Sequence, residues 1–194
     1  QTTIVNKSVR LKPQLFYGRT PQKRLFEPVT CGRSEKPRGG LWTSSQIDRK
    51  NPTLSDWTRW CEAEDFHPEN KGVHQLKITK ADIYEIDTAE DLELLISKFP
   101  LDSNWGEQTY GETWEIIKNG NHILSGFIPV FDYEKFAASD YDGFRVTQKA
   151  IYQGEIFKHL FNWRDHYVLS PFRNFDVETV FWTRWCFDGS KKLQ

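Results

Sequence analysis

The chain has 194 residues, a net charge of −1 and 38% hydrophobic residues, which is typical of one globular domain with enough apolar side chains for a core. The balanced charge gives no overall attraction to nucleic acid or to a membrane surface, although a local basic patch is still allowed. No apolar run reaches transmembrane length, and residues 1–16 lack the apolar stretch of a signal peptide. We therefore expect a single domain over residues 1–194, located in the cytoplasm and not in a membrane.

The cysteine, histidine and tryptophan contents narrow the kinds of site. Three widely spaced cysteines favour reduced thiols over a disulfide framework. The histidines and cysteines show no zinc spacing, so no metal site is expected. Asp140 and Asp142 resemble calcium ligands, but their spacing does not continue into an EF-hand loop. The eight tryptophans indicate a large aromatic core or, alternatively, a surface on which a flat ligand stacks.

The first forty-five residues combine a predicted strand with a basic, glycine-rich loop. Residues 15–17 form an apolar run that a turn at 18–21 ends, and this turn presents Tyr17, Arg19 and Thr20. The loop 31–40 is either a solvated segment or a phosphate-binding one, since it combines glycines with guanidinium groups. Two glycines at its end allow close approach to a ligand, and residues 41–43 can then begin a strand.

Helical and strand patterns follow in the middle of the chain. Residues 53–66 predict a helix capped by Thr53 or Ser55, whose face of Trp57, Trp60 and Cys61 is better explained as core than as a cofactor site. Other segments are expected as follows: one or two strands in 73–86, a helix at 89–99 capped by Thr88, a surface loop at 101–112, an undecided segment at 113–117, a turn at 119–121, a strand or apolar loop at 123–131, a short helix at 133–138 after Asp132, a strand at 144–146, a helix or extended insertion at 150–163, and a frayed polar tail from 191.

The stretch 172–185 is the most informative part of the chain. Residues 179–186 are dense in aromatic and β-branched side chains and predict a buried strand, preceded by a loop that contains Pro171. Asp176 and Glu178 lie at the start of that strand. A carboxylate in this position is held by the sheet and can face a cleft, where it would stabilise a developing positive charge. The alternative is that both carboxylates are simply solvated.

The motifs, taken in order, resemble those of the ADP-ribosyltransferase family of bacterial toxins and phage-encoded modifying enzymes. In that family an Arg or His lies on a first strand, an aromatic residue with Ser-Thr-Ser on a second, and a Glu before a later strand. The corresponding runs here are Tyr17-Gly18-Arg19-Thr20, Gly40-Leu41-Trp42-Thr43-Ser44-Ser45 and Asp176-Val177-Glu178. The patches 36–44, 57–66 and 141–143 are also similar to uncharacterised phage proteins near that group.

The resemblance implies an ADP-ribosyltransferase-like fold of the α+β class, with a mixed or antiparallel split sheet and a few flanking helices. It implies NAD as substrate, with Glu178 stabilising an oxocarbenium-like state, Asp176 as base toward the acceptor and Ser44 as a further catalytic residue. Ser44 or Ser45 is expected to hydrogen-bond Glu178 or the nicotinamide ribose. Arg19 is expected to pair with the pyrophosphate. The expected NAD-binding residues are Tyr17, Arg19, Thr20, Arg38, Gly40, Trp42, Thr43 and Ser45.

The acceptor stays open at this point. Asp176 stands where the family has Glu or Gln, and that position helps to choose the acceptor, so a protein, a nucleic acid or water are all allowed. An antitoxin or a host target protein is a further expected partner. The alternative is a non-catalytic, phage-type binding protein that sequesters a host protein or a nucleotide. The two hypotheses differ at Glu178, whose replacement by glutamine removes activity with little loss of fold in the first and is nearly silent in the second.

Overall fold

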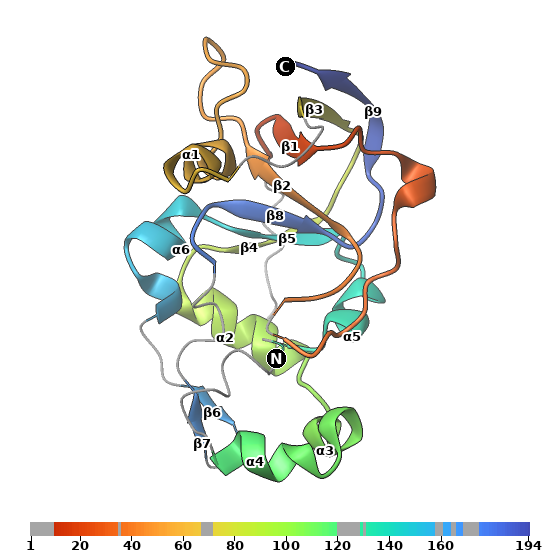
Figure 1. Ribbon diagram of the computed structural model, residues 1–194, viewed down its shortest axis with the longest axis vertical. Coiled ribbons are helices and arrows are strands. Elements are labelled where there is room, and N and C mark those ends of the chain that lie inside the picture. Colours follow the sequence, from red (N-terminus) through yellow and green to blue (C-terminus); the bar gives the residue numbers. More distant parts are fainter. Residues whose placement is uncertain are drawn as a thin grey trace.

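The computed structural model describes residues 10–34, 36–66, 72–119, 129, 131–157, 161–163, 166–168 and 175–194. Its main feature is a mixed seven-stranded sheet in the order β4-β5-β8-β2-β1-β3-β9, in which only β4 and β5 pair in parallel (Figure 1). The strands of this sheet are β1 (Gln14–Gly18), β2 (Leu41–Ser45), β3 (Gly72–Ile78), β4 (Ile83–Ile86), β5 (Gly143–Val146), β8 (Thr179–Trp182) and β9 (Phe187–Lys192). The α+β class is therefore confirmed.

Short helices flank the sheet, and a separate hairpin of β6 (Phe161–Trp163) and β7 (His166–Val168) lies beside α4 at the lower end in Figure 1. The helices are α1 (Asp56–Ala63), α2 (Ala89–Lys98), α3 (Trp105–Tyr110), α4 (Thr113–Asn119), α5 (Tyr133–Ala137) and α6 (Gln148–Tyr152), with short 3-10 turns η1 (Lys23–Leu25) and η3 (Glu155–Phe157). Helix α1 covers one end of the sheet, whereas α2 and α5 lie below β4 and β5 (Figure 1).

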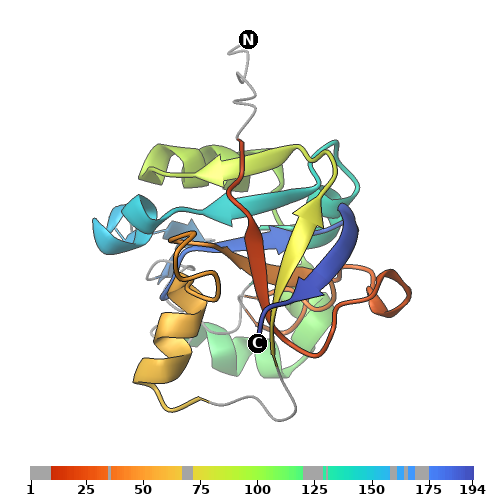
Figure 2. The same cartoon turned by 90° about the horizontal axis from the view of Figure 1, so that it is seen from above.

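The sheet divides along strand β2. Residues 41–43 of β2 pair with β8, whereas only Ser44 and Ser45 pair with β1. Because one short strand serves both neighbours in turn, the two halves of the sheet need not stay coplanar. Figure 2 shows β1, β3 and β9 running steeply across the direction of β4, β5 and β8. This divergence opens the sheet at the end of β2, where the candidate site lies.

An aromatic core holds the lower half of the sheet against the helices. Phe144 of β5 and Phe181 of β8 are fully buried and 5.5 Å apart between ring centroids. Phe131, Tyr133 and Phe136 pack on them from the segment that contains α5. The expectation of a large aromatic core is confirmed. Edge-to-face ring geometry of this kind adds to the stabilisation that burial alone provides.

The two predicted capped helices begin where their cap residues require. Ser55 caps α1, and its side chain and that of Thr58 exchange hydrogen bonds with each other's backbone. Thr88 and Asp91 do the same at the start of α2. Each reciprocal pair satisfies two backbone N–H groups that a helix start leaves without a partner. Asp132 likewise accepts hydrogen bonds from two backbone N–H groups at the start of α5, as predicted.

Three predictions of local structure were wrong. The expected surface loop 101–112 contains helix α3, whose Trp105 packs edge-on against Trp114 of α4. The expected frayed tail continues as β9, because its polar residues pair with β3 from Lys192↔His74 to Phe187↔Ile78. The strand predicted at 179–186 ends at Trp182. Four predictions lie wholly or partly outside the described residues: the turn at 119–121 beyond Asn119, nearly all of the segment 123–131, part of 150–163, and the loop with Pro171, Arg173 and Asn174.

The described residues bear on the expected cysteine chemistry, metal ligands and membrane spans. Cys31, Cys61 and Cys186 form no disulfide bond with one another. Within the described ranges no group of three or more His, Cys, Asp or Glu is placed to hold a metal ion, and Asp142 instead pairs with Arg184 at 3.1 Å. In the same ranges, every helix is too short or too polar to cross a bilayer.

A buried histidine gives the fold an expected pH dependence. His74 of β3 is 2% exposed, and burial lowers its pKa below the ordinary value of 6.5, with the nearby Lys192 charge adding to the effect. Because the unfolded chain then binds more protons below pH 6.5, the stabilisation is present above that pH and is lost as the pH falls. We expect the melting temperature to drop between about pH 7 and about pH 5.5, and the drop to be smaller in His74→Leu. Equal slopes in thermal melts of the two proteins would contradict this.

Candidate functional site

The carboxylate of Glu178 is the centre of the most extensive buried hydrogen-bond network at the split in the sheet. Glu178 directly precedes β8 and is 2% exposed. Its Oε2 accepts hydrogen bonds from Ser44 Oγ at 3.0 Å and Ser45 N at 2.8 Å. Its Oε1 accepts from Ser45 Oγ at 2.8 Å and Arg145 Nε at 2.9 Å. Four donors match the full accepting capacity of a carboxylate.

The register of β2 and β8 explains why the carboxylate lies there. The last pair of the β2–β8 ladder is Thr43↔Val180, so the continued register brings Glu178 opposite Ser45. Beyond that pair β2 turns to β1 as its partner. Ser45 N–H therefore donates to the Glu178 side chain rather than to a strand backbone. The hydrogen bonds from the two serines to Glu178 are therefore a direct consequence of the split of the sheet at β2.

A chain of side-chain hydrogen bonds orients the Ser45 hydroxyl toward Glu178. Trp182 Nε1 donates to Thr43 Oγ1 at 2.8 Å, and Thr43 Oγ1 donates to Gln14 Oε1 at 2.6 Å. Gln14 Nε2 in turn donates to Ser45 Oγ at 3.0 Å. Because Ser45 Oγ already accepts from Gln14, its own proton points to Glu178. Every member of this chain is buried, which makes it costly to leave any of them without a partner.

Arg145 and Asp56 connect Glu178 to β5 and to α1. Arg145 of β5 lies between Glu178 and Glu85, with a second contact of 3.1 Å from its Nη1 to Glu85. Asp56, the first residue of α1, accepts a 3.3 Å hydrogen bond from the backbone N–H of Glu178. Asp56 also accepts from the hydroxyl of Tyr152, and burial followed by the Asp56 charge raises the pKa of Tyr152 above 10. The phenol therefore remains a proton donor at neutral pH.

An aromatic pocket of about 440 Å³ adjoins this network. Val177 and Thr179, on either side of Glu178, contribute to its wall. Trp57 and Trp60 of α1 lie in it with ring planes 8° apart and centroids 4.9 Å apart. The described residues that line it are Leu15, Phe16, Tyr17, Lys36, Trp42, Thr43, Trp57, Trp60, Phe175, Asp176, Val177 and Thr179. Its size and its aromatic walls with a few polar groups are typical of small-molecule sites.

The polar groups of the pocket come from three different segments. Tyr17 lies near the end of β1, and Asp176 precedes β8. Lys36 lies in the basic loop, with its Nζ 5.3 Å from the Phe175 ring centroid. Asp176 is exposed and makes no hydrogen bond or ion pair with the described part of the chain. The exposed carboxylate of Asp176 thus differs from that of Glu178, which is buried and accepts four hydrogen bonds.

The structure brings together seven of the eleven predicted site residues. Tyr17, Trp42, Thr43 and Asp176 line the pocket. Ser44, Ser45 and Glu178 form the network beside it.

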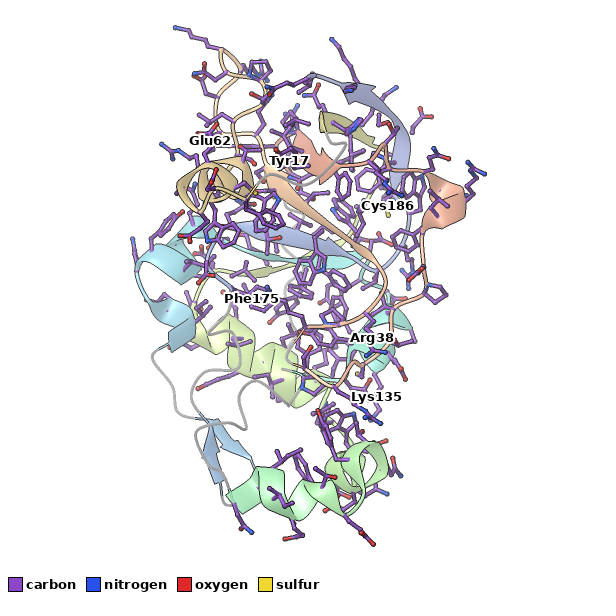
Figure 3. The ribbon with its side chains drawn as sticks, in the orientation of Figure 1. Tyr17, Arg38, Glu62, Lys135, Phe175 and Cys186 are labelled. Atoms are coloured by element: carbon purple, nitrogen blue, oxygen red, sulfur yellow. The ribbon has the colours of Figure 1, made fainter. Side chains whose placement is uncertain are left out.

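The other four predicted residues lie elsewhere. Arg19, Thr20 and Gly40 line a separate hollow of about 180 Å³, and only Phe16 lines both. Arg38 is exposed in the loop, and Figure 3 shows it on the side of α5 and Lys135, away from Tyr17.

Gly40 has a structural reason that the sequence did not reveal. Its backbone has a φ of +64°, and a Cβ there would lie 2.5 Å from the Phe181 ring. Gly40 therefore allows the basic loop to pass close over β8. This requirement is independent of any ligand.

Sequence reasoning missed five residues that build the site: Gln14, Asp56, Trp57, Trp60 and Arg145. The prediction that the tryptophan face of α1 is core was only partly right, since Cys61 is buried but Trp57 and Trp60 line the pocket. Arg145 did carry a signal, because a charged residue between Phe144 and Val146 in a buried strand needs a partner. Gln14 and Asp56 gave none, since their roles depend on contacts with distant segments.

Comparison with known proteins yields no relative. No family model matches the chain, and neither the curated proteins nor the solved structures contain a match.

Proposed function

We propose that the protein is a mono-ADP-ribosyltransferase that transfers ADP-ribose from NAD to a macromolecular acceptor in the cytoplasm, as the family resemblance implies. The main support for the proposal is that the hydroxyls of Ser44 and Ser45 both donate hydrogen bonds to Glu178 beside an aromatic pocket. The strand with the serines, the strand after Glu178 and the strand with Tyr17 are neighbours in one sheet. This brings together three motifs that lie far apart in the sequence.

The chemistry assigns a role to each side of the site. Nicotinamide stacks among the pocket's aromatic rings, with Trp42 and Tyr17 as its nearest expected partners. The bond between the nicotinamide nitrogen and ribose C1′ breaks, and its electron pair leaves with nicotinamide. The positive charge that develops on the ribose is stabilised by the Glu178 carboxylate. The acceptor's nucleophile then forms a bond to C1′ and gives its proton to Asp176.

Turnover requires Glu178 to exchange one of its four donors for the ribose 2′-hydroxyl. Ser44 is the donor that can leave most easily, because its hydroxyl also lies 2.9 Å from the backbone carbonyl oxygen of Glu178. When the Ser44 proton turns fully to that carbonyl, one lone pair of Oε2 becomes free. Ser45 and Arg145 then keep the carboxylate in place.

The phosphates of NAD have two candidate sources of positive charge. Lys36 lines the pocket itself. Arg19 and Thr20 line the neighbouring hollow, which shares Phe16 with the pocket. We propose that the dinucleotide passes over Phe16, with its nicotinamide in the pocket and its pyrophosphate toward Arg19. Arg38, which is exposed in the basic loop 31–40, has no role in this arrangement.

The full engagement of Glu178 favours a second candidate, a non-catalytic binding protein. In that case the Glu178 network is purely structural, and the aromatic pocket holds a nucleobase or an aromatic side chain of a host protein. The exposed Asp176 and Lys36 would supply specificity at its rim.

The experiment that tests the proposed function measures NAD consumption with host cell lysate. NAD labelled on its adenylate half is incubated with the purified protein, and the lysate is separated into protein and nucleic acid. Label transferred to either fraction supports the transferase and names the acceptor class. Nicotinamide release without transfer indicates that water is the acceptor. No turnover by the folded protein in any fraction would reject the enzyme and favour the binding protein.

A further inference from the structure

A second and larger concave surface lies at the other end of β1, away from the aromatic pocket. This groove has a volume of about 1000 Å³. The described residues that line it are 10–13, 46, 47, 49, 75–78 and 188–191. The register explains its shape, since Gln14 pairs with Ser45 and Leu76, and Leu76 pairs with Ser190. The segment after β2, the segment before β1, and parts of β3 and β9 therefore lie side by side along the groove.

The groove is strongly positive in a chain whose net charge is −1. The described residues of its lining include five cationic side chains and one carboxylate, a net charge of +4: Arg10, Lys12, Arg49, Lys77, Lys191 and Asp188. All five cations are exposed. Asp188 lies 3.5 Å from Lys77, and both side chains are more than 70% exposed, so this pair contributes little and is easily exchanged.

The cations are spread out rather than gathered at one point. Arg49 follows β2, Lys12 precedes β1, Lys77 is on β3 and Lys191 is on β9. The four strands are neighbours in the order β2-β1-β3-β9, so the charges are distributed over four adjacent segments. A single phosphate contacts only one or two such positions. A chain of phosphates, each carrying its own charge, can contact all of them at once.

The side chains that line the groove indicate which part of a nucleic acid they can contact. Among the described residues that line the groove none is aromatic, and aliphatic side chains such as Leu11 and Ile47 lie between the cations. These residues offer no ring for base stacking. The groove suits contacts with a sugar–phosphate backbone, which carry no sequence information.

We propose that this groove binds the phosphate backbone of a nucleic acid without sequence preference. The proposal rests on the charges and their spacing, and not on NAD chemistry. The groove lies next to the Glu178 network, so under the transferase assignment a bound nucleic acid would lie close to the reacting atoms. Gln14 links the two, because its Nε2 donates both to the Lys12 carbonyl at 3.0 Å and to Ser45.

The test is fluorescence anisotropy with a dye-labelled oligonucleotide of mixed sequence, single-stranded and as a duplex, in the absence of NAD. The double variant Lys12→Gln/Lys191→Gln removes two charges from the groove. The matched control Lys23→Gln/Arg24→Gln removes two exposed charges from η1, outside the lining. We expect the groove variant to lose roughly tenfold or more in affinity at low salt and about 1.4 in the salt slope, since each single-strand phosphate contributes about 0.7.

Each other outcome overturns the proposal. Wild-type protein that does not bind the oligonucleotide at low salt would exclude the site. An equal loss in both double variants would assign binding to overall charge or to the basic loop instead. Polyglutamate that competes as well as the oligonucleotide would indicate an acidic protein partner, and competition by millimolar inorganic phosphate would indicate a small-anion site. Because NAD is absent throughout, these results are independent of the proposed enzyme activity.

Discussion

Replacing Glu178 with glutamine is expected to lower ADP-ribose transfer by about a hundredfold to a thousandfold, the usual cost of losing one electrostatic partner of a transition state. The neutral amide no longer stabilises positive charge on the ribose. The labelled-NAD assay measures this directly, with initial rates for the variant and the wild type at equal concentrations of folded protein.

The same substitution also has a structural cost that the sequence did not predict. Each oxygen of Glu178 accepts two hydrogen bonds, so the amide NH₂ of glutamine faces donors wherever it is placed. Losing such buried pairs costs about 1–3 kcal/mol. We therefore expect a lower melting temperature, and the rates must be compared well below the transition. The earlier expectation of little loss of fold is revised for this reason.

Glu85→Gln is the matched control for the Glu178 variant. It makes the same chemical change in the other carboxylate that contacts Arg145, on a residue that does not line the aromatic pocket. We expect its transfer rate to stay within about twofold of wild type, as for a partly exposed ion pair outside the site. Full activity in Glu178→Gln would contradict the assigned role, and an equal loss in both variants would assign the effect to Arg145.

Replacing Phe144 with alanine is expected to cost about 3–5 kcal/mol of unfolding free energy, which is a large part of the total stability of a domain of this size. Phe144 is fully buried, and its ring contacts Trp42, Phe131, Phe136 and Phe181. Truncation removes these contacts and leaves a cavity between β5 and β8. Urea denaturation followed by tryptophan fluorescence measures the change.

The matched control for the core variant is Ile116→Ala on α4. Ile116 is 74% exposed, so its truncation is expected to change the unfolding free energy by less than about 0.5 kcal/mol. A cost below about 1 kcal/mol for Phe144→Ala would show that the core relaxes around the missing ring. The aromatic cluster would then contribute less to the fold than its burial indicates.

Local structure was largely predictable where short-range signals were strong. The Ser55 and Thr88 caps located two helices, and the aromatic run after Glu178 located β8. Prediction failed where long-range pairing decides. The polar residues 188–192 have no strand pattern of their own, yet they form β9 because the edge of β3 supplies their backbone partners. Helix α3 likewise depends on the packing of Trp105 against Trp114.

By itself the sequence determined the α+β class and the positions of the motifs, because these depend on local pattern and residue chemistry. The expected contact of Ser44 or Ser45 with Glu178 came from the family resemblance. Only the tertiary structure decided which candidates meet. It placed Arg19 and Thr20 at a separate hollow and added Arg145, Asp56 and Gln14 around Glu178. The physical reason is the split at β2, since the partner of each strand end is set by contacts between segments far apart in the chain.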